Sequence, residues 1–388
     1  MTIGHTCRLR NRRQLVAIRA LACMAIASAC GAFASRTVTA PQPVAPDLTL
    51  ISLTEGGGAY AGSLTSGGAA YAWGENFYGN LGDGTNTDRN SPVAVTGGLR
   101  FSSLTMGGFH TCGVTTNGAA YCWGLNVKGE LGDGTTTQVD LRNPSRMGRN
   151  APTAVTGGLL FNSIVAGSSH TCALRSDGVA FCWGWNGAGQ LGDGTTTSRN
   201  APVPVTGGLM FRSLAAGDGH TCGLTGSGSA YCWGRNDYGQ LGDGTTIYRN
   251  APVAVLGRLT FTSLTAGVGA SCGLTSGGAA YCWGTNNYGQ VGDGTRIQRS
   301  EPEAVTGGLR FRSLAQGGHT CGLTSDGEAY CWGANWRGEL GDGSTSPRYA
   351  PVAVKGGLRF ISLTAGGDQT CGVTTSGAAY CWGIKHQH

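Results

Sequence analysis

The residues best suited to chemistry in this chain are cysteines, and most of them occur at one fixed spacing. Twelve of the fifteen cysteines form pairs whose members are ten residues apart: Cys112 with Cys122, Cys172 with Cys182, Cys222 with Cys232, Cys272 with Cys282, Cys321 with Cys331, and Cys371 with Cys381. Each pair flanks a turn-forming segment, which places the two Cα atoms opposite each other on neighbouring strands at about 4.5 Å. Where the first cysteine of a pair is replaced by Gly62, the second is replaced as well, by Ala72. Structural zinc sites place cysteines closer together in the chain, so we predict six disulfides and an oxidising compartment.

Histidines and aspartates also recur, and a structural role explains their pattern better than a metal does. Four histidines lie two residues before a cysteine: His110, His170, His220 and His319. A ring of histidines would suit a metal, but Tyr60, Ala270 and Gln369 take the same place in other units, so we expect hydrogen bonds instead. Each aspartate of the repeated Leu-Gly-Asp-Gly segment is followed by an arginine, as Asp83 is by Arg89, and we expect ion pairs within the loop. Nucleophile, phosphate-loop and metalloprotease motifs are absent from the sequence, so we predict no catalytic residue, cofactor or metal site.

These residues belong to a unit that recurs seven times. The repeated Trp-Gly occurs at intervals of 50, 60, 50, 50, 49 and 50 residues, starting from Trp73. Within a unit, an alternating segment such as 99–105 precedes a hairpin, a glycine-rich loop and a short Pro-Val-x-Val segment, which indicates four strands. Glycine makes up 70 of the 388 residues, which disfavours long helices. The sequence therefore predicts an all-β protein, a seven-bladed β-propeller.

The two ends of the chain are expected to meet in one blade. The seventh unit stops at Trp382-Gly383 without its fourth strand, and Pro43-Val44-Ala45 precedes the first unit without a hairpin before it. We expect this N-terminal strand to complete the seventh blade, because ring closure removes exposed sheet edges. The expected domains are an export signal over 1–34, a short linker over 35–42 and a single propeller over 43–388.

The first 34 residues are typical of an export signal. Residues 1–19 are basic, residues 20–29 are small and apolar, and 32–34 form a small-x-small cleavage pattern before Ser35. Two refinements stay open: residues 26–31 resemble a bacterial lipoprotein box in which Cys30 carries the lipid, and Arg12-Arg13 resembles a twin-arginine signal. The expected location is the periplasm, the cell-envelope surface or the extracellular medium, with membrane contact only through a lipid on Cys30.

Net charge argues against nucleic acid as a partner. The formal charge is +6, but the leader before residue 31 contributes five unopposed arginines. The rest of the chain has 22 basic and 21 acidic residues, and such a near-neutral body lacks the net positive charge that binds phosphate backbones.

The repeat resembles a known family. The pattern Gly-x-x-His-Thr-x-x-Leu-Thr-x-x-Gly-x-x-Tyr-x-Trp-Gly-x-Asn-x-x-Gly-x-Leu-Gly-x-Gly-Thr is similar to the regulator-of-chromosome-condensation repeat, with six full copies and one truncated copy over 43–383. The resemblance implies a seven-bladed propeller. It leaves the function open, because this fold hosts a guanine-nucleotide exchange factor, a plant ultraviolet receptor and a secreted β-lactamase inhibitor.

Candidate binding residues are those in which the repeats differ. They lie in the loops after each Trp-Gly and in an insertion, 139–148, carried by one unit: Phe77, Tyr78, Trp185, Tyr238, Tyr288, Trp336, Arg337, Leu141, Arg142 and Arg146. Aromatic side chains and arginine are favoured at protein interfaces, and long loops on rigid scaffolds often carry function. Packing on the neighbouring blade is the alternative for Tyr78, Tyr238 and Tyr288, and a neutral insertion is the alternative for 139–148.

We therefore expect a monomeric, exported scaffold that binds an extracytoplasmic protein through loops on one face and is not an enzyme. Two alternatives stay open. In a carbohydrate-binding or adhesive surface module, the same aromatic side chains would stack on sugar rings. In a hydrolase, polar groups in the central channel would carry the reaction.

Overall fold

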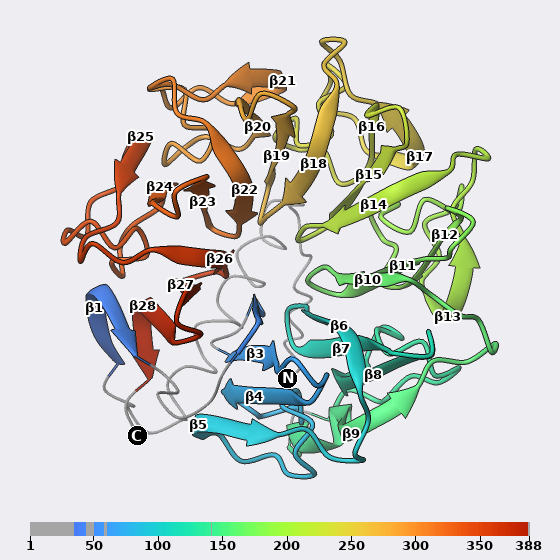
Figure 1. The fold of residues 1–388 in the computed structure, drawn as a ribbon. Coiled ribbons are helices and arrows are strands. Elements are labelled where there is room, and N and C mark those ends of the chain that lie inside the picture. The colour runs from blue at the N-terminus through green and yellow to red at the C-terminus, as the bar shows by residue number, and fades with distance from the viewer. Residues whose placement is uncertain (1–34, 44–49, 58–59, 141, 387–388) are drawn as a thin grey trace, which may run out of the picture.

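Seven four-stranded antiparallel sheets are arranged as the blades of a ring (Figure 1). This arrangement comes from a computed structural model, which describes residues 35–43, 50–57, 60–140 and 142–386. Apart from its strands, this part of the chain contains a short 3-10 helix, η1 (Pro144–Met147). A search of the same residues finds no helix with the length and hydropathy needed to span a membrane. The all-β, seven-bladed propeller expected from the repeats is confirmed.

Each blade is a meander whose first strand faces the centre of the ring and whose fourth lies at the rim (Figure 1). Blades 1 to 3 are formed by β2 (Ser52–Glu55), β3 (Tyr60–Leu64), β4 (Ala70–Gly74) and β5 (Arg89–Ala94); β6 (Phe101–Met106), β7 (His110–Thr115), β8 (Ala120–Leu125) and β9 (Gly148–Ala154); β10 (Ser163–Ala166), β11 (His170–Leu174), β12 (Ala180–Gly184) and β13 (Arg199–Pro204). Blades 4 to 6 are formed by β14 (Phe211–Ala216), β15 (His220–Thr225), β16 (Ala230–Gly234) and β17 (Arg249–Ala254); β18 (Phe261–Ala266), β19 (Ala270–Thr275), β20 (Ala280–Gly284) and β21 (Arg299–Ala304); β22 (Phe311–Gln316), β23 (His319–Thr324), β24 (Ala329–Gly333) and β25 (Arg348–Ala353). Blade 7 contains β26 (Phe360–Ala365), β27 (Gln369–Thr374), β28 (Ala379–His386) and β1 (Ser35–Pro43).

The N-terminal segment pairs with the last strand of the chain. β1 runs antiparallel to β28, with Gln42 opposite Cys381 and Pro43 opposite Tyr380. This pairing is compatible with the expected ring closure, but it corrects the expected boundaries, because residues 35–42 belong to a strand and not to a linker. Residues 44 and 45, which we expected in that strand, lie outside the described residues, as do the export signal and Cys30.

Tryptophan and phenylalanine form the core between blades. Trp183 is fully buried, and its ring centroid lies 6.1 Å from that of Phe161. The Trp183 Nε1–H donates a hydrogen bond of 2.9 Å to the carbonyl of Glu130 in the preceding blade. Trp123, Trp233, Trp283 and Trp332 make the equivalent bond to the preceding blade. Buried indoles with a bonded N–H thus hold neighbouring blades in a fixed orientation.

The six expected disulfides are present, one in each blade from the second to the seventh. They join Cys112 to Cys122, Cys172 to Cys182, Cys222 to Cys232, Cys272 to Cys282, Cys321 to Cys331, and Cys371 to Cys381. The two members of each pair are partners in the register of the second and third strands, and their Cα atoms are 4.1 Å apart in every bridge. All twelve cysteines are buried, so the bridges are part of the core and not of a binding surface.

The glycine after the first cysteine of a bridge makes room for an aromatic ring. Gly113 lies opposite Tyr121 in the register. The space beside Gly113 is filled by Phe101, since a Cβ there would lie 2.6 Å from that ring.

Blade 1 replaces the bridge with a side chain from its neighbour. A Cβ on Gly62 would lie 2.2 Å from Cε of Met106, which reaches over from blade 2. Met106 joins Tyr60, Ala72 and Leu81 in one buried apolar cluster. The flexible thioether fills the volume that a disulfide takes in the other blades.

One space at each blade interface is filled in different ways around the ring, and we call it the interface slot: the space beside a loop glycine such as Gly107. His110 fills the slot beside Gly107 from its own blade, whereas Gln316 of blade 6 fills the slot beside Gly267 of blade 5. In blade 5 the histidine position is Ala270, which leaves that slot to its neighbour. The slots beside Gly56, Gly107, Gly167 and Gly217 are thus filled from their own blade, and the slot beside Gly267 from the next one.

The ring has two chemically different faces. The Trp-loop face carries the loops after each Trp-Gly (75–88, 126–147, 185–198, 235–248, 285–298 and 334–347), the connections between first and second strands, and the residues that open each fourth strand. The hairpin face carries the turns between second and third strands, the connections between blades (95–100, 155–162, 205–210, 255–260, 305–310 and 354–359) and the residues that open each first strand. In an antiparallel meander, alternate connections emerge at opposite edges of the sheet.

Candidate functional site

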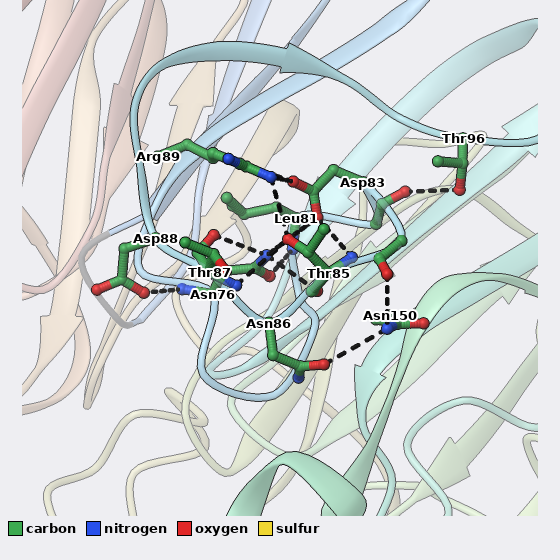
Figure 2. Close-up of polar contacts among 12 residues, drawn as sticks. Asn76, Leu81, Asp83, Thr85, Asn86, Thr87, Asp88, Arg89, Thr96 and Asn150 are labelled. Atoms are coloured by element: carbon green, nitrogen blue, oxygen red, sulfur yellow. Dashed lines mark hydrogen bonds and ion pairs between the residues drawn. The ribbon is translucent and has the colours of Figure 1, made fainter.

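Each Trp-loop is built around a buried asparagine that sequence reasoning did not single out. Asn76 Nδ2 donates to Oδ1 of Asp83 and to the carbonyls of Thr85 and Thr87, each at 3.1 Å (Figure 2). Its Oδ1 accepts a 2.9 Å bond from the Leu81 N–H. The same position is buried in five further loops, at Asn126, Asn186, Asn236, Asn286 and Asn335. Its recurrence in the Trp-Gly-x-Asn motif could have identified this asparagine from the sequence.

An aspartate and an arginine close each of these loops. Arg89 Nη2 lies 2.7 Å from Asp83 Oδ2, and the Thr85 N–H and Oγ1–H both donate to Asp83 Oδ1 (Figure 2). Burial alone would raise the pKa of Asp83, but the bonds from Thr85 and Arg89 outweigh it and hold that pKa below its usual value. The expected ion pairs are present in all six loops. The loops are therefore internally cross-linked and leave few free charges.

The insertion in blade 2 lies against blade 1. A Cβ on Gly148 would lie 2.2 Å from the Tyr78 carbonyl oxygen. Met147 is buried, whereas Arg142 and Arg146 are exposed, as a binding role requires. The Arg142 N–H donates to Oδ1 of Asp140 at 3.0 Å. Leu141 lies outside the described residues.

The aromatic candidates form two exposed clusters, and two further candidates are half-buried. Phe77 and Tyr78 of blade 1 contact each other and Tyr78 contacts Phe109 of blade 2, with ring centroids 5.2 Å apart in both pairs. Tyr288 and Trp336, from blades 5 and 6, pack edge to face at 4.3 Å. Phe77 is 48% exposed and Trp336 50%, and Arg337 beside it is exposed.

Trp185 and Tyr238 lie between these clusters and are only half-exposed. A Cβ on Gly187 would lie 2.7 Å from Nε1 of Trp185, so the loop backbone covers part of that indole. The Arg235 guanidinium stacks 5.8 Å from the Tyr238 ring. All three tyrosines also contact the neighbouring blade, as the alternative predicted: Tyr78 contacts Phe109, Tyr288 contacts Trp336, and a Cβ on Gly269 would lie 3.4 Å from Cδ2 of Tyr238. A binding role for them stays a prediction.

Several exposed residues of this face were missed by sequence reasoning. Phe109, Tyr248, Val268, Ile297 and Tyr349 are each more than a third exposed. Tyr349 is the second residue of β25, and the Arg296 guanidinium of the preceding Trp-loop lies 5.8 Å from its ring. These residues also depart from the repeat, as Trp336 does, but they lie outside the segment directly after Trp-Gly.

The four repeated histidines are structural. His110 Nε2 lies 2.9 Å from Thr171 Oγ1, and that hydroxyl donates to the Glu130 carbonyl, so the histidine carries its proton on Nε2. Burial lowers the pKa of His110 to about 4, which leaves the ring neutral at pH 7. His170, His220 and His319 make the equivalent contact to the next blade. Each lies in a separate interface, so the expected hydrogen-bonding role is confirmed.

A cavity of about 440 Å³ opens at the centre of the ring, between the ends of the first strands. Glu55 and Asp218 are the charged residues in its lining. Burial raises the pKa of Glu55 well above its usual value. Glu55 also lies near the sulfurs of Cys371 and Cys381, but these are bonded to each other and so do not form a thiolate metal site.

Comparison with known proteins places the propeller in a class and then in a family. As a class, it is a ring of seven blades built from one repeat. The model of the Regulator of chromosome condensation (RCC1) repeat matches residues 67–114, 117–174, 177–224, 227–274, 277–323 and 326–373. A second model with this description matches 101–130, 161–190, 211–240 and 261–290. The chain belongs to the RCC1 repeat family.

Solved structures share this fold at low sequence identity. The chain is similar to human WBSCR16, with 19% identity over 90% of each chain and a TM-score of 0.76. It is similar to yeast RCC1 (Prp20) bound to Kap60, with 21% identity over 87% of this chain and 81% of that chain and a TM-score of 0.69. The CRINKLY ectodomain of the Arabidopsis thaliana receptor kinase ACR4 matches at 21% identity over 87% and 99% of the two chains, with a TM-score of 0.54. A search of curated protein sequences returned no match.

Proposed function

We propose that this chain is an exported scaffold that binds another protein through its Trp-loop face. One observation carries the proposal: the most exposed aromatic side chains of the described residues all belong to that face. They are Phe77, Phe109, Tyr248, Tyr288, Trp336 and Tyr349. Large, rigid aromatic side chains are the usual anchors of protein interfaces, because they bury much area at little cost in side-chain entropy.

The face is ordered before a partner arrives. Asn286 accepts a 2.9 Å bond from the Val291 N–H, and Arg299 pairs with Asp293 at 2.7 Å, so the loop that carries Tyr288 is fixed at both ends. Trp336 in turn packs against Tyr288. Binding to such a surface loses little conformational freedom, which favours affinity.

Related structures and the disulfides support the same proposal. Yeast Prp20 bound to Kap60, and Prp20p described together with its binding to Gsp1p and histones, are propellers of similar fold that bind proteins. Six disulfides suit an oxidising compartment and agree with the export signal expected over 1–34. We propose a binding role and not an enzymatic one because the four repeated histidines, which would be natural bases, are buried between blades and do not line the central cavity.

The test is binding of a purified partner to matched variants. The oxidised protein is used to capture exported proteins of its own cell, and a captured protein is then titrated against wild type, Tyr288→Ala/Trp336→Ala and Leu160→Ala/Ile361→Ala. The second variant pair removes exposed apolar residues from the hairpin face. We expect affinity to fall at least about 30-fold for the Trp-loop variant, as for an interface hot spot, and to be unchanged for the hairpin variant.

Two outcomes would overturn the proposal. If the Trp-loop variant binds as wild type does, the site lies elsewhere. If soluble glycans displace the captured protein or bind with the same dependence on Trp336, the carbohydrate-binding alternative replaces it.

A further inference from the structure

The hairpin face carries an excess of positive charge that the whole-chain count conceals. Eight basic residues belong to it, Lys355 and seven arginines: Arg100, Arg175, Arg212, Arg258, Arg310, Arg312 and Arg359. Its acidic residues are three: Asp177, Asp326 and Glu328. The Trp-loop face instead pairs its arginines with aspartates loop by loop. The near-neutral body of the chain is thus the sum of a basic hairpin face and a remainder in which acidic residues outnumber basic ones.

Most of these arginines have no acidic partner. Asp177 pairs with Arg175 at 2.9 Å, and Glu328 pairs with Arg359 at 2.5 Å. Arg100, Arg258 and Arg310 are exposed and make no ion pair with a described residue.

Two further arginines are held in place by backbone. Arg212 Nη2 donates to the carbonyls of Phe261 and Thr262 in the next blade, at 3.0 and 2.9 Å. Arg312 makes the equivalent bonds to Phe360 and Ile361 at 3.0 and 2.8 Å. Carbonyl oxygens satisfy N–H donors without neutralising the charge, so these guanidinium groups stay available to anions.

Aliphatic side chains are interleaved with the arginines. Leu160 is 61% exposed, Met210 55%, and Ile51 and Ile361 are also exposed on this face. Leu160 and Met210 occupy the position, one residue before the buried phenylalanine, that Arg100, Arg310 and Arg359 occupy in other blades. Strongly exposed aromatic side chains, by contrast, are absent from the described residues of this face.

One arginine is kept despite an unfavourable backbone conformation. Arg258 has φ +51°, in a turn where the other connections place a glycine: Gly98, Gly158, Gly208, Gly308 and Gly357. A side chain with a Cβ is strained in the left-handed region, whereas glycine is not. The arginine at the tip of this turn therefore lowers the stability of the fold relative to glycine.

We propose that the hairpin face binds the surface of an anionic lipid bilayer, and this surface is separate from the proposed protein-binding face. A planar bilayer suits residues spread over a whole face: phosphate groups meet the arginines, and aliphatic side chains enter the boundary of the acyl chains. A soluble polyanion would reward the arginines but not Leu160 and Met210. A sugar chain would favour aromatic platforms, which lie on the other face.

Sedimentation with vesicles tests this inference. The exported protein carries Cys30→Ala, so that no acyl chain contributes, and is mixed with vesicles of phosphatidylcholine alone or of phosphatidylcholine with phosphatidylglycerol. We expect binding to the anionic vesicles only, weakening as salt rises. Arg258→Gly and Arg310→Gln should each lower the partition coefficient roughly five-fold. Leu160→Thr/Met210→Thr should lower it as well, and threonine already occupies this position in blade 5, at Thr260.

Matched variants and a competing polyanion separate the outcomes. Arg296→Gln/Arg337→Gln removes two charges from the Trp-loop face and should leave vesicle binding unchanged. Equal binding to both vesicle types, or an equal loss in this control, would overturn the inference. So would tight binding to heparin or double-stranded DNA together with no effect of Leu160→Thr/Met210→Thr, because the face would then serve a soluble polyanion. None of these results bears on the Tyr288→Ala/Trp336→Ala test of protein binding.

Discussion

The loops on the two faces of the ring are held in place in different ways. A Trp-loop bonds its polar groups to one another: Asn76 bonds four times within its own loop, and Asp83 is paired with Arg89. A hairpin turn is shorter and bonds mainly through one threonine, as Thr225 bonds to Ser227 and Ser229. On the same face, Arg258 in an inter-blade connection stands on strained backbone. One face is rigid and nearly balanced in charge, while the other is plain in structure and basic.

In a repeat protein, therefore, the rigidity of a loop and its charge can vary independently. Strands and inter-blade tryptophans are common to all the blades, so they fix the distances between loops without fixing the chemistry at either end. The buried histidines lie at the Trp-loop end of their blades, at the start of four of the second strands. Stability at that face therefore depends on buried polar groups, whereas at the hairpin face it depends on glycine turns.

Lowering the pH should have the largest effect on stability, and it should affect the two faces unequally. The folded pKa of His110 is about 4 and that of His170 about 3, both below the ordinary value of 6.5. Because the unfolded chain binds the extra proton first, full stability is present above pH 6.5 and is lost as pH falls toward 4. Each buried histidine should lower the free energy of unfolding by up to about 1.4 kcal/mol per pH unit in this window.

Urea titrations at several pH values measure this loss, and hydrogen exchange should show Trp-loop peptides opening before hairpin peptides. His319→Gln should make the dependence shallower, since Gln369 already occupies that position in blade 7. A free energy of unfolding that stays flat from pH 7 to pH 5 would contradict the assignment of these histidines as buried and neutral.

Removing one loop asparagine should have the next largest effect. Asn286→Ala leaves the buried Val291 N–H and the carbonyls of Thr295 and Ile297 without their partner. We expect a loss of about 3 kcal/mol in the free energy of unfolding, because buried groups lose their bonds. Ser276→Ala, in an exposed hairpin turn, should change it by less than about 0.5 kcal/mol. Equal effects at the two positions would mean that the faces do not differ in rigidity.

Each disulfide lies between the two faces of its blade, so removing one should affect the loops on both faces. Replacing Cys222 and Cys232 together by alanine opens one bridge, and the chain-entropy model gives a loss of about 2 kcal/mol, since the hairpin already restricts the loop. Hydrogen exchange should rise in both the Trp-loop and the hairpin turn of blade 4. An effect confined to one of them would show that the two ends of a blade unfold separately.

The smallest expected effect has the opposite sign. Arg258→Gly relieves the φ of +51° and should raise the free energy of unfolding by about 1 kcal/mol. Arg310→Gln, with an ordinary backbone, should leave it unchanged. Thermal unfolding of both variants provides the measurement, and destabilisation by Arg258→Gly would show that the arginine contributes contacts that outweigh its strain.

Features that depend on a single repeat could be predicted from the sequence, whereas the particular contacts between two repeats could not. Spacing within a unit predicts the hairpin, the Cys112–Cys122 bridge and the Asp83–Arg89 pair, because those partners are local. Packing of Tyr288 on the neighbouring blade was one of two alternatives, but its partner Trp336 was not foreseen, since that requires knowing which positions of adjacent loops meet. The basic hairpin face was hidden for a related reason: a net charge sums over residues that the fold sends to opposite sides.

The interface slots have a consequence for how such a ring can be rearranged. Blade 3 fills its slot with His170 and meets Ala216 of blade 4, whereas blade 5 has Ala270 and meets Gln316 of blade 6. If blades 3 and 5 exchanged places, Ala270 would face Ala216 and leave a void, and His170 would collide with Gln316. At these two interfaces, near-identical repeats thus fit their own successors and not each other's. A circular permutant, which keeps every neighbour, should assemble, and a shuffled order should not.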